Sequence, residues 1–232
     1  MTWGSLGPGN DQFSYPKGIA VDKNDNIYVV NYVYTRVHKF DSNGNFLRKW
    51  GTFGTADGQF WSPKYIAIDK NNAVYVTDSW NNRVQKFAAS GVFLGKFGTE
   101  GTGNGRFNGP RGIAIDDAGY IYIVDSGNHR IQKFDSDFNF ICKWGSEGTQ
   151  EGEFLGPMGI AVDEKGYVYV TDAETDKISV FNSSGSFITM WGISGAAPKE
   201  IDMPIGIRVF GNFIYVCDAM NHRVQIFKTI NE

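Results

Sequence analysis

The segment "GIAVD", from Gly18 to Asp22, decides the fold because close versions of it recur along the chain. They read "YIAID" at 65, "GIAID" at 112, "GIAVD" at 159 and "GIRVF" at 206. A proline stands two residues before each copy, and these prolines are spaced 47 residues apart: Pro16, Pro63, Pro110, Pro157 and Pro204. Such a constant spacing indicates tandem structural repeats.

Each repeat contains four short β-rich segments. In the second repeat they are "YIAID" (65–69), "VYVTD" (74–78), "RVQKF" (83–87) and "FLGKFG" (93–98). Turn-forming residues separate them, and no segment has the spacing of an amphipathic helix. Four antiparallel strands in a repeat of this length are typical of a propeller blade. We therefore predict an all-β fold: a β-propeller of five four-stranded blades in a single domain, residues 1–232, with repeats at about 5–51, 52–98, 99–145, 146–192 and 193–228 plus 1–4.

The two ends of the sequence suggest how the propeller closes. After Phe227 the fifth repeat has only "KTINE", so it lacks the outer strand of the other repeats. The pair Trp3-Gly4 matches Trp50-Gly51, which ends that strand in the first repeat. An unpaired outer strand is prone to aggregation. We predict that residues 1–4 complete the last blade and close the ring.

Composition sets limits on function. The chain has 232 residues, 41% of them hydrophobic, and a formal net charge of −3. The hydrophobic fraction is large enough to form a core. The small net charge creates no overall electrostatic field that would attract nucleic acid or an anionic membrane. No apolar run reaches the ~20 residues of a membrane span, and "MTWGSLG" is not a signal peptide. We expect a soluble protein, with the cytoplasm as the favoured location, and buried thiols rather than a disulfide at Cys142 and Cys217.

The repeat at Gly105 to Phe134, "GRFNGPRGIAIDDAGYIYIVDSGNHRIQKF", resembles the NHL repeat, and the resemblance covers nearly the entire chain. It implies a β-propeller, often of six blades. Members of the family include RNA-binding translational repressors, tripartite-motif ubiquitin ligases, bacterial sensor kinases and a peptide-amidating lyase, so the fold does not fix the function. The count of five departs from the common arrangement and fits a five-bladed ring, a fragment or an engineered piece.

Most recurring polar residues have structural explanations. An acidic residue, or Asn31 in the first repeat, ends the second strand, and a basic residue follows five positions later, which predicts a charge-assisted pair. The acidic positions are Asp78, Asp125, Asp172 and Asp218, and the basic ones are Arg36, Arg83, Arg130, Lys177 and Arg223. Asp22 and its equivalents Asp69, Asp116 and Asp163 predict Asx turns; "DKNDN" at 22–26 lacks the glycine and terminal glutamate of a calcium loop.

The histidines are the obvious candidates for catalysis or metal binding. His38, His129 and His222 lie in non-adjacent repeats and outside the innermost strands, so they do not converge as a zinc site requires. Resemblance to the amidating lyase implies histidines around the channel with a catalytic arginine and tyrosine, and no such set is found. The sequence also lacks the serine-hydrolase and zinc-protease motifs. We predict a non-enzymatic protein without a metal or cofactor.

A binding function is expected in the loops, where the repeats differ from each other. The loops of the first two repeats are rich in aromatic residues, and residues after the register prolines are basic. The predicted partner-binding residues are Tyr32, Tyr34, Trp61, Tyr65, Trp80, Lys17, Lys64 and Arg111. The fourth repeat is acidic instead, with Glu147, Glu151, Glu153, Glu174 and Asp176. Aromatic loop residues on adjacent blades predict a contact surface.

Several alternatives remain open from sequence. The aromatics can pack between blades with the charges simply solvated. Aromatics beside cations also suit single-stranded RNA, although three basic residues neutralise few phosphates. A protein or peptide partner is favoured by the mixed charge and the aromatic anchors. A monomer is favoured, with blade sharing in an oligomer as the alternative. Further alternatives are an engineered or fragmentary propeller without a ligand, and a lyase-like enzyme.

Overall fold

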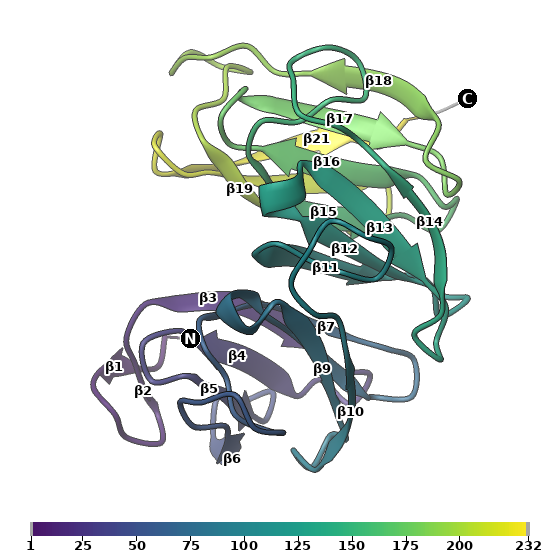
Figure 1. Ribbon diagram of the computed structural model, residues 1–232. Coiled ribbons are helices and arrows are strands. Elements are labelled where there is room, and N and C mark those ends of the chain that lie inside the picture. The colour runs from purple at the N-terminus through teal and green to yellow at the C-terminus, as the bar shows by residue number, and fades with distance from the viewer. Residues whose placement is uncertain (1, 231–232) are drawn as a thin grey trace. The chain divides into compact units, whose positions relative to one another are not determined.

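The computed structural model describes residues 2–230 and is all-β (Figure 1). Its sheets follow the sequence repeats, one small antiparallel sheet to each repeat. The five-bladed β-propeller fold is therefore confirmed. The chain divides into two compact units, Met1–Pro110 and Arg111–Glu232, which are described separately. The single-domain organisation stays a prediction.

The first unit contains blades 1 and 2. Blade 1 has the strand order β3 (Pro16–Val21), β4 (Ile27–Asn31), β5 (Arg36–Phe40) and β6 (Phe46–Trp50). Blade 2 has β7 (Pro63–Ile68), β8 (Val74–Asp78), β9 (Arg83–Phe87) and β10 (Phe93–Phe97), with the 3-10 helix η1 (Ser79–Asn81) between β8 and β9. Before blade 1, β1 (Ser5–Leu6) pairs in parallel with β2 (Gln12–Phe13).

The second unit contains blades 3 to 5. Blade 3 has β11 (Pro110–Ile115), β12 (Ile121–Asp125), β13 (Arg130–Phe134) and β14 (Phe140–Trp144), with η2 (Ser126–Asn128) after β12. Blade 4 has β15 (Pro157–Val162), β16 (Val168–Asp172), β17 (Lys177–Phe181) and β18 (Phe187–Trp191). Blade 5 has three strands, β19 (Pro204–Phe210), β20 (Phe213–Asp218) and β21 (Arg223–Lys228).

The predicted completion of the last blade by residues 1–4 stays a prediction. Residues 2–4 form no strand, the sheet of β19 to β21 has three strands, and Met1 lies outside the described residues. Trp3 instead packs on blade 1, with its ring centroid 6.1 Å from that of Phe40. This contact uses the aromatic side chain and leaves the backbone of residues 2–4 outside any sheet.

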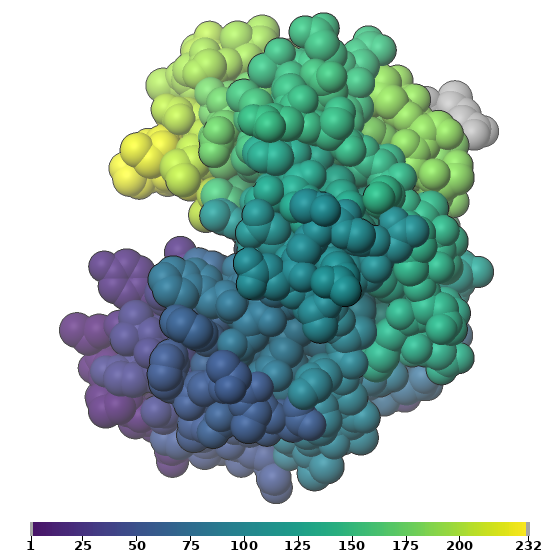
Figure 2. Space-filling model, viewed as in Figure 1, coloured from purple at the N-terminus to yellow at the C-terminus, as the bar shows by residue number. Residues whose placement is uncertain are grey.

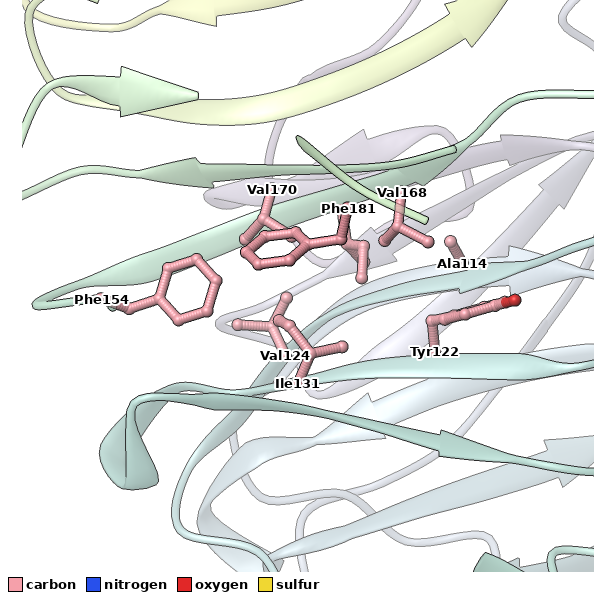
Figure 3. Close-up of a cluster of buried hydrophobic side chains, with 9 residues drawn as sticks. Ala114, Tyr122, Val124, Ile131, Phe154, Val168, Val170 and Phe181 are labelled. Atoms are coloured by element: carbon pink, nitrogen blue, oxygen red, sulfur yellow. The ribbon is translucent and has the colours of Figure 1, made fainter. Parts of the chain in front are cut away.

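The core lies between the faces of neighbouring blades. Between blades 3 and 4, Tyr122, Val124 and Ile131 pack against Val170 and Phe181 (Figure 3). Each of β8, β12 and β16 is buried along its whole length, which explains why these segments are continuous runs of apolar and small polar residues. Burying one such side chain fully contributes about 1.5–3 kcal/mol, so this packing is the main stabilising term.

The turns after the innermost strands are Asx turns, as predicted. The Asp69 carboxylate accepts N–H bonds from Asn71 at 2.8 Å and Ala73 at 2.9 Å. Its other oxygen accepts the hydroxyl of Tyr75 at 3.1 Å. Blades 1, 3 and 4 repeat the tyrosine contact at Asp22, Asp116 and Asp163. The carboxylate therefore closes the turn and satisfies a buried phenol.

The prediction of buried thiols is wrong. Both cysteines are free, Cys142 is half-buried and Cys217 is exposed. Cys217 lies on β20, whose outward face in blade 5 is open to solvent. Among the described residues, no helical segment is long and apolar enough to cross a membrane.

His38 is the one buried histidine of the described chain and lies on β5. Its Nδ1 lies 3.0 Å from the Asn10 carbonyl oxygen. Burial is the main cause that lowers the pKa of His38 from 6.5 to about 4, and nearby Arg36 and Lys49 lower it further. The equivalent positions of blades 2, 3 and 5 carry glutamine: Gln85, Gln132 and Gln225.

We predict that His38→Gln weakens the dependence of stability on acid. Because the folded-state pKa lies below the unfolded value, the unfolded state binds the proton first. The contribution of neutral His38 to the free energy of unfolding is then fully present above about pH 6.5. It is lost as pH falls towards 4, by at most ~3 kcal/mol. Urea unfolding at pH 7.5 and pH 5 measures this. The wild type should lose more stability than the variant over this interval, and equal losses would show that His38 does not titrate in this way.

Candidate recognition surface

The predicted aromatic residues of blade 2 flank one end of its sheet. Pro63 at the start of β7 pairs with Asp78 at the end of β8. Trp61 precedes this pair and Trp80 follows it, and the Trp80 N–H donates to the Trp61 carbonyl at 3.1 Å. The two loops are thus fixed to each other by backbone bonds, and both indoles emerge at the same end of the blade.

Three aromatic side chains form a contiguous cluster at this end, here called the aromatic ladder: Phe53, Trp61 and Trp80. The ring centroids of Phe53 and Trp61 are 5.7 Å apart, and those of Trp61 and Trp80 are 5.3 Å apart. Phe53 is 65% exposed, Trp61 38% and Trp80 61%. The alternative that Trp61 and Trp80 are buried between blades is therefore wrong.

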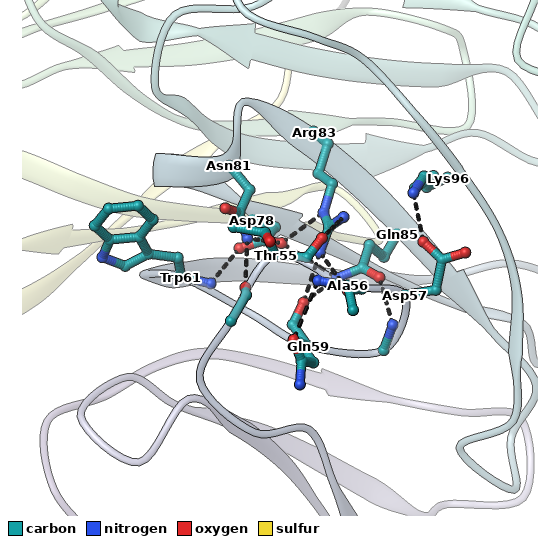
Figure 4. Close-up of polar contacts among 12 residues, drawn as sticks. Thr55, Ala56, Asp57, Gln59, Trp61, Asp78, Asn81, Arg83, Gln85 and Lys96 are labelled. Atoms are coloured by element: carbon teal, nitrogen blue, oxygen red, sulfur yellow. Dashed lines mark hydrogen bonds and ion pairs between the residues drawn. The ribbon is translucent and has the colours of Figure 1, made fainter.

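A buried polar network supports the ladder (Figure 4). The Asp78 carboxylate accepts the Trp61 N–H at 2.6 Å, Asn81 Nδ2 at 2.8 Å and Arg83 Nε at 2.8 Å. Gln85 Nε2 adds a fourth bond at 3.2 Å. The Trp61 ring points away from this network, so its backbone is fixed while its indole stays available (Figure 4).

Arg83 extends the network into the loop that carries Phe53. Its guanidinium donates to the carbonyls of Thr55 at 2.7 Å, Ala56 at 2.9 Å and Gln59 at 2.7 Å. Five donors in a rigid fork suit this task, which lysine cannot perform. The loop before β7 is consequently tied to β8 and β9 through one buried ion pair.

The same carboxylate–arginine pair recurs in other blades, which confirms the predicted pairing there. Arg130 Nε lies 2.7 Å from Asp125, and Arg223 Nε lies 2.7 Å from Asp218. Burial raises the pKa of Asp78, and the bonds from Asn81, Trp61 and Arg83 oppose this. At Asp218 burial also raises the pKa, but hydrogen bonds from the Asp202 backbone and Arg223 outweigh it, so the pKa is lowered.

In blade 1 the neutral Asn31 stands in place of the carboxylate of this pair. Asn31 accepts the Ser14 N–H at 3.1 Å and donates to the Gln12 carbonyl at 3.1 Å. Without a carboxylate partner, Arg36 donates to the Tyr34 carbonyl at 3.1 Å and lies 5.4 Å from the Tyr34 ring centroid. Tyr34 is therefore used to hold Arg36 within blade 1.

The predicted lysines gather around Tyr32. The Lys64 Nζ lies 4.4 Å from the Tyr32 ring centroid and Lys17 Nζ lies 6.0 Å from it. Tyr32 follows β4 just as Ser79 follows β8, so this group lies at the same end of blade 1 as the ladder in blade 2. Cation–π contacts of this kind contribute about 0.5–1 kcal/mol at exposed sites.

The remaining predicted residues are placed elsewhere. Tyr65 lies on β7 and is half-buried, and its N–H donates to Thr77 Oγ1 at 3.0 Å. Its Cα lies 2.8 Å from where a Cβ on Gly18 would be, so it marks the close approach of β3 and β7. Arg111 belongs to the second unit and contacts the sulfur of Met158.

Sequence reasoning missed Phe53, although a signal was present. The equivalent positions are Glu100, Glu147 and Ser194, each of which forms the same isolated bridge to the residue seven positions later. Phe53 is the aromatic exception in a loop position that is otherwise polar. The described residues contain no group of three or more His, Cys, Asp or Glu that could hold a metal ion.

The NHL repeat model matches three segments of the chain, residues 60–87, 107–134 and 202–227. Each segment runs from the end of the loop before a blade to the third strand of that blade. The chain is a β-propeller that contains NHL repeats. No curated protein matches it.

Solved structures share the fold of this NHL-repeat propeller at low sequence identity. A streptogramin B lyase matches with 15% identity and a TM-score of 0.68, over 92% of this chain and 65% of that one. A catalytically inactive virginiamycin B lyase from Staphylococcus aureus with quinupristin gives 18% and 0.67, over 96% and 68%. A nidogen/laminin complex gives 17% and 0.70, over 94% and 77%.

These similarities show the fold alone. The propeller spans 65% of the length of the streptogramin B lyase. A gluconolactonase from Xanthomonas campestris is also similar, at 14% identity and a TM-score of 0.65, over 89% of this chain and 70% of that one. Because the similar structures include enzymes and a protein complex, the fold does not decide between catalysis and binding.

We predict that Asp78→Ala destabilises the protein by about 3–5 kcal/mol, since it leaves Arg83 buried without its partner. Asp57→Ala is the matched control, because Asp57 pairs with Lys96 at the surface and both side chains are about half exposed. That change should cost less than about 1 kcal/mol. Denaturant unfolding measures both. Similar losses in the two variants would contradict a special role for the buried pair.

Proposed function

We propose that this propeller is a non-catalytic recognition module that binds a protein or peptide through the aromatic ladder and the neighbouring Tyr32, Lys17 and Lys64. The observation that carries the proposal is the exposure of Phe53, Trp61 and Trp80 as one contiguous cluster. Exposed large aromatics cost solubility, and contiguous ones are typical of interaction surfaces.

The ladder has the properties of a binding hot spot. Tryptophan provides a large contact area with few rotatable bonds, so little entropy is lost when a partner binds. The backbone of Trp61 is held by Asp78, and the loop of Phe53 is held by Arg83. A surface that is already ordered before binding avoids part of the cost of association.

The lysines indicate the chemistry of the partner. Lys17 on β3 of blade 1 and Lys64 on β7 of blade 2 both lie beside Tyr32, at the corresponding end of blade 1. An extended peptide that places an apolar or aromatic side chain on the ladder and a carboxylate near these lysines would use both groups. We therefore expect an acidic peptide with an apolar anchor.

Contacts that hold the fold account for the buried ring of His38 and for the backbones of His129 and His222. His38 is buried against the Asn10 carbonyl. His129 has a positive φ of 52°, and its N–H donates to the Ser126 carbonyl as the C-cap of η2. His222 has the same backbone role, with φ 53° and a bond to the Ala219 carbonyl. The nidogen/laminin complex is an instance of a similar fold in a protein assembly.

Single-stranded RNA is the second candidate, and two exposed indoles, Trp61 and Trp80, together with the lysines beside Tyr32 favour it. Bases stack on such aromatics with about 1–3 kcal/mol each. RNA binding would depend steeply on salt, because each neutralised phosphate releases counterions. A peptide held by aromatic contacts would depend on salt only weakly.

We predict that Trp80→Ala weakens peptide binding at least tenfold, by removing an anchor of the ladder. Peptides are selected from a phage-displayed random library on the wild type, and fluorescence anisotropy then measures the affinity of one selected peptide. Leu94→Ala is the control, because Leu94 is also exposed but lies on β10, the outermost strand of blade 2.

The competing outcomes are distinct. Binding of a uridine oligonucleotide with a steep salt dependence and loss on Lys64→Ala, in the absence of a selected peptide, would replace the proposal with RNA recognition. Selected peptides that bind the Trp80 and Leu94 variants equally well would place recognition elsewhere on the molecule.

A further inference from the structure

The turn between β17 and β18 of blade 4 contains a sequence found nowhere else in the chain. It reads Asn182-Ser183-Ser184, and no other asparagine is followed two positions later by serine or threonine. Asparagine in this pattern, with any middle residue except proline, is the acceptor for N-linked glycans. The pattern is short, so the structure of the turn has to show that the asparagine is available.

The side-chain oxygen of Asn182 closes the turn. Its Oδ1 accepts the Ser184 N–H at 3.0 Å, the Ser184 hydroxyl at 2.7 Å and the Ser186 N–H at 2.9 Å. Within the described residues 2–230, the amide nitrogen Nδ2 has no hydrogen-bond partner. The atom that a glycan would be attached to is therefore not needed to hold the turn.

The equivalent turns of blades 1 and 3 use both side-chain atoms at this position, which is an aspartate there. One carboxylate oxygen accepts two backbone N–H groups of the turn. The other accepts a side-chain amide at 2.8 Å, in the pairs Asp41–Asn45 and Asp135–Asn139. In blade 4 Ser186 replaces that second asparagine. The departures from the repeat thus create the acceptor pattern and also leave Nδ2 without a partner.

The turn is fixed to the preceding blade, which belongs to the same unit. The Gly185 N–H donates to the Asn182 carbonyl at 3.0 Å. Lys133 Nζ on β13 donates to the Ser183 carbonyl at 2.9 Å. A Cβ placed on Gly185 would lie 2.6 Å from the Trp144 ring, so this ring packs closely on the turn. These contacts are made by backbone atoms and by Gly185, and none of them uses the Asn182 amide nitrogen.

A bulky polar group has room beside this turn. Asn182 is half-buried, while Ser183, Ser184 and Ser186 are exposed. Atoms in the light green of β17 and β18 are open to view in Figure 2. The turn follows the end of β17, whereas the loop that corresponds to that of Trp80 precedes its start. A glycan would therefore lie at the opposite end of blade 4 from that loop.

We infer that Asn182 is an acceptor site for an N-linked glycan, transferred from a polyprenyl-diphosphate-linked oligosaccharide. A bond forms between Nδ2 and the anomeric carbon of the first sugar. The bond from that carbon to a phosphate oxygen breaks, its electron pair leaves with the diphosphate, and Nδ2 loses one proton. A transferase must bind residues 182–184 in its own active site, so the transfer has to precede formation of the turn.

The inference does not rest on the proposed function, because Asn182 lies in the second unit and the aromatic ladder lies in the first. Donors of this kind meet only chains that cross a membrane. An occupied Asn182 would therefore identify the protein as exported and would replace the cytoplasmic location expected from the sequence.

The test is translation of the full chain behind a cleavable signal peptide, in the presence of endoplasmic reticulum microsomes. The wild type should gain the mass of one glycan, and peptide-N-glycosidase should remove it and convert Asn182 to aspartate. Ser184→Ala should abolish the gain, whereas the matched control Ser183→Ala keeps the pattern and should retain it. Asn182→Asp, which restores the residue type of blades 1 and 3, should also abolish the gain.

Two further measurements concern the folded protein. The glycosylated and enzymatically deglycosylated chains should have Tm values within about 2 °C of each other, because changes at exposed positions have small effects on stability. The folded, unmodified chain should stay unmodified when purified transferase and donor are added.

Three results would overturn the inference. The first is a wild type that gains no glycan in microsomes that modify a control glycoprotein. The second is a glycan that persists in the Ser184→Ala variant. The third is a glycosylated chain that fails to fold, since the turn would then be unable to carry the glycan.

Discussion

The structure depends on the burial of one blade face against the next. Val, Ile, Tyr and Phe residues on the second and third strands recur in each repeat, and between blades 3 and 4 they form a continuous apolar layer (Figure 3). No single blade can bury its own faces, so stability comes from neighbouring repeats. This constraint explains why the repeat length is conserved within the chain through four intervals of 47 residues.

Polar groups at the end of each blade are a second requirement of the same packing. Strands buried on both faces leave their connecting loops to be fixed by buried side chains, and Asp78 with Arg83 provides this in blade 2. In blade 1 no carboxylate stands at this position, and the loops are held by hydrogen bonds of Asn31 and His38 with the backbone. Once the loop backbone is fixed from inside, its outward side chains are free to vary. The aromatic ladder lies on such loops, so its side chains can change without disturbing the core.

Much of the fold could be predicted from sequence because residues that recur at a fixed spacing occupy equivalent positions in successive blades. The spacing of the register prolines predicted the blades. The five-residue spacing of Asp78 and Arg83 predicted their ion pair. Trp61 and Trp80 could be selected because they depart from the repeat. Phe53 departs from the repeat in the same way, because its equivalents Glu100 and Glu147 are charged. What repetition cannot give is the direction of an individual side chain: Tyr34 turns to Arg36, and Tyr65 packs beside β3.

The end of the last blade shows another limit of sequence reasoning. The match between Trp3-Gly4 and Trp50-Gly51 correctly identified Trp3 as the end of an outer-strand motif. Its side chain accordingly takes the place of Trp50 in the next repeat. Its backbone, however, is not in a sheet, because two or three residues supply few hydrogen bonds for the entropy lost in ordering them. The local motif therefore predicted the packing of a side chain, and the pairing of residues 1–4 with blade 5 stays a prediction.

We propose that a rigid scaffold presents the aromatic ladder for recognition. The most direct measurement is NMR mapping of a library-selected peptide on the isotope-labelled protein, following the indole N–H signals of Trp61 and Trp80 and the backbone amides. We expect large shifts at both indoles and in the loops around residues 53 and 61, with the amides of β8 and β9 nearly unchanged. Shifts confined to the loops of the second unit, or spread through the strands, would contradict it.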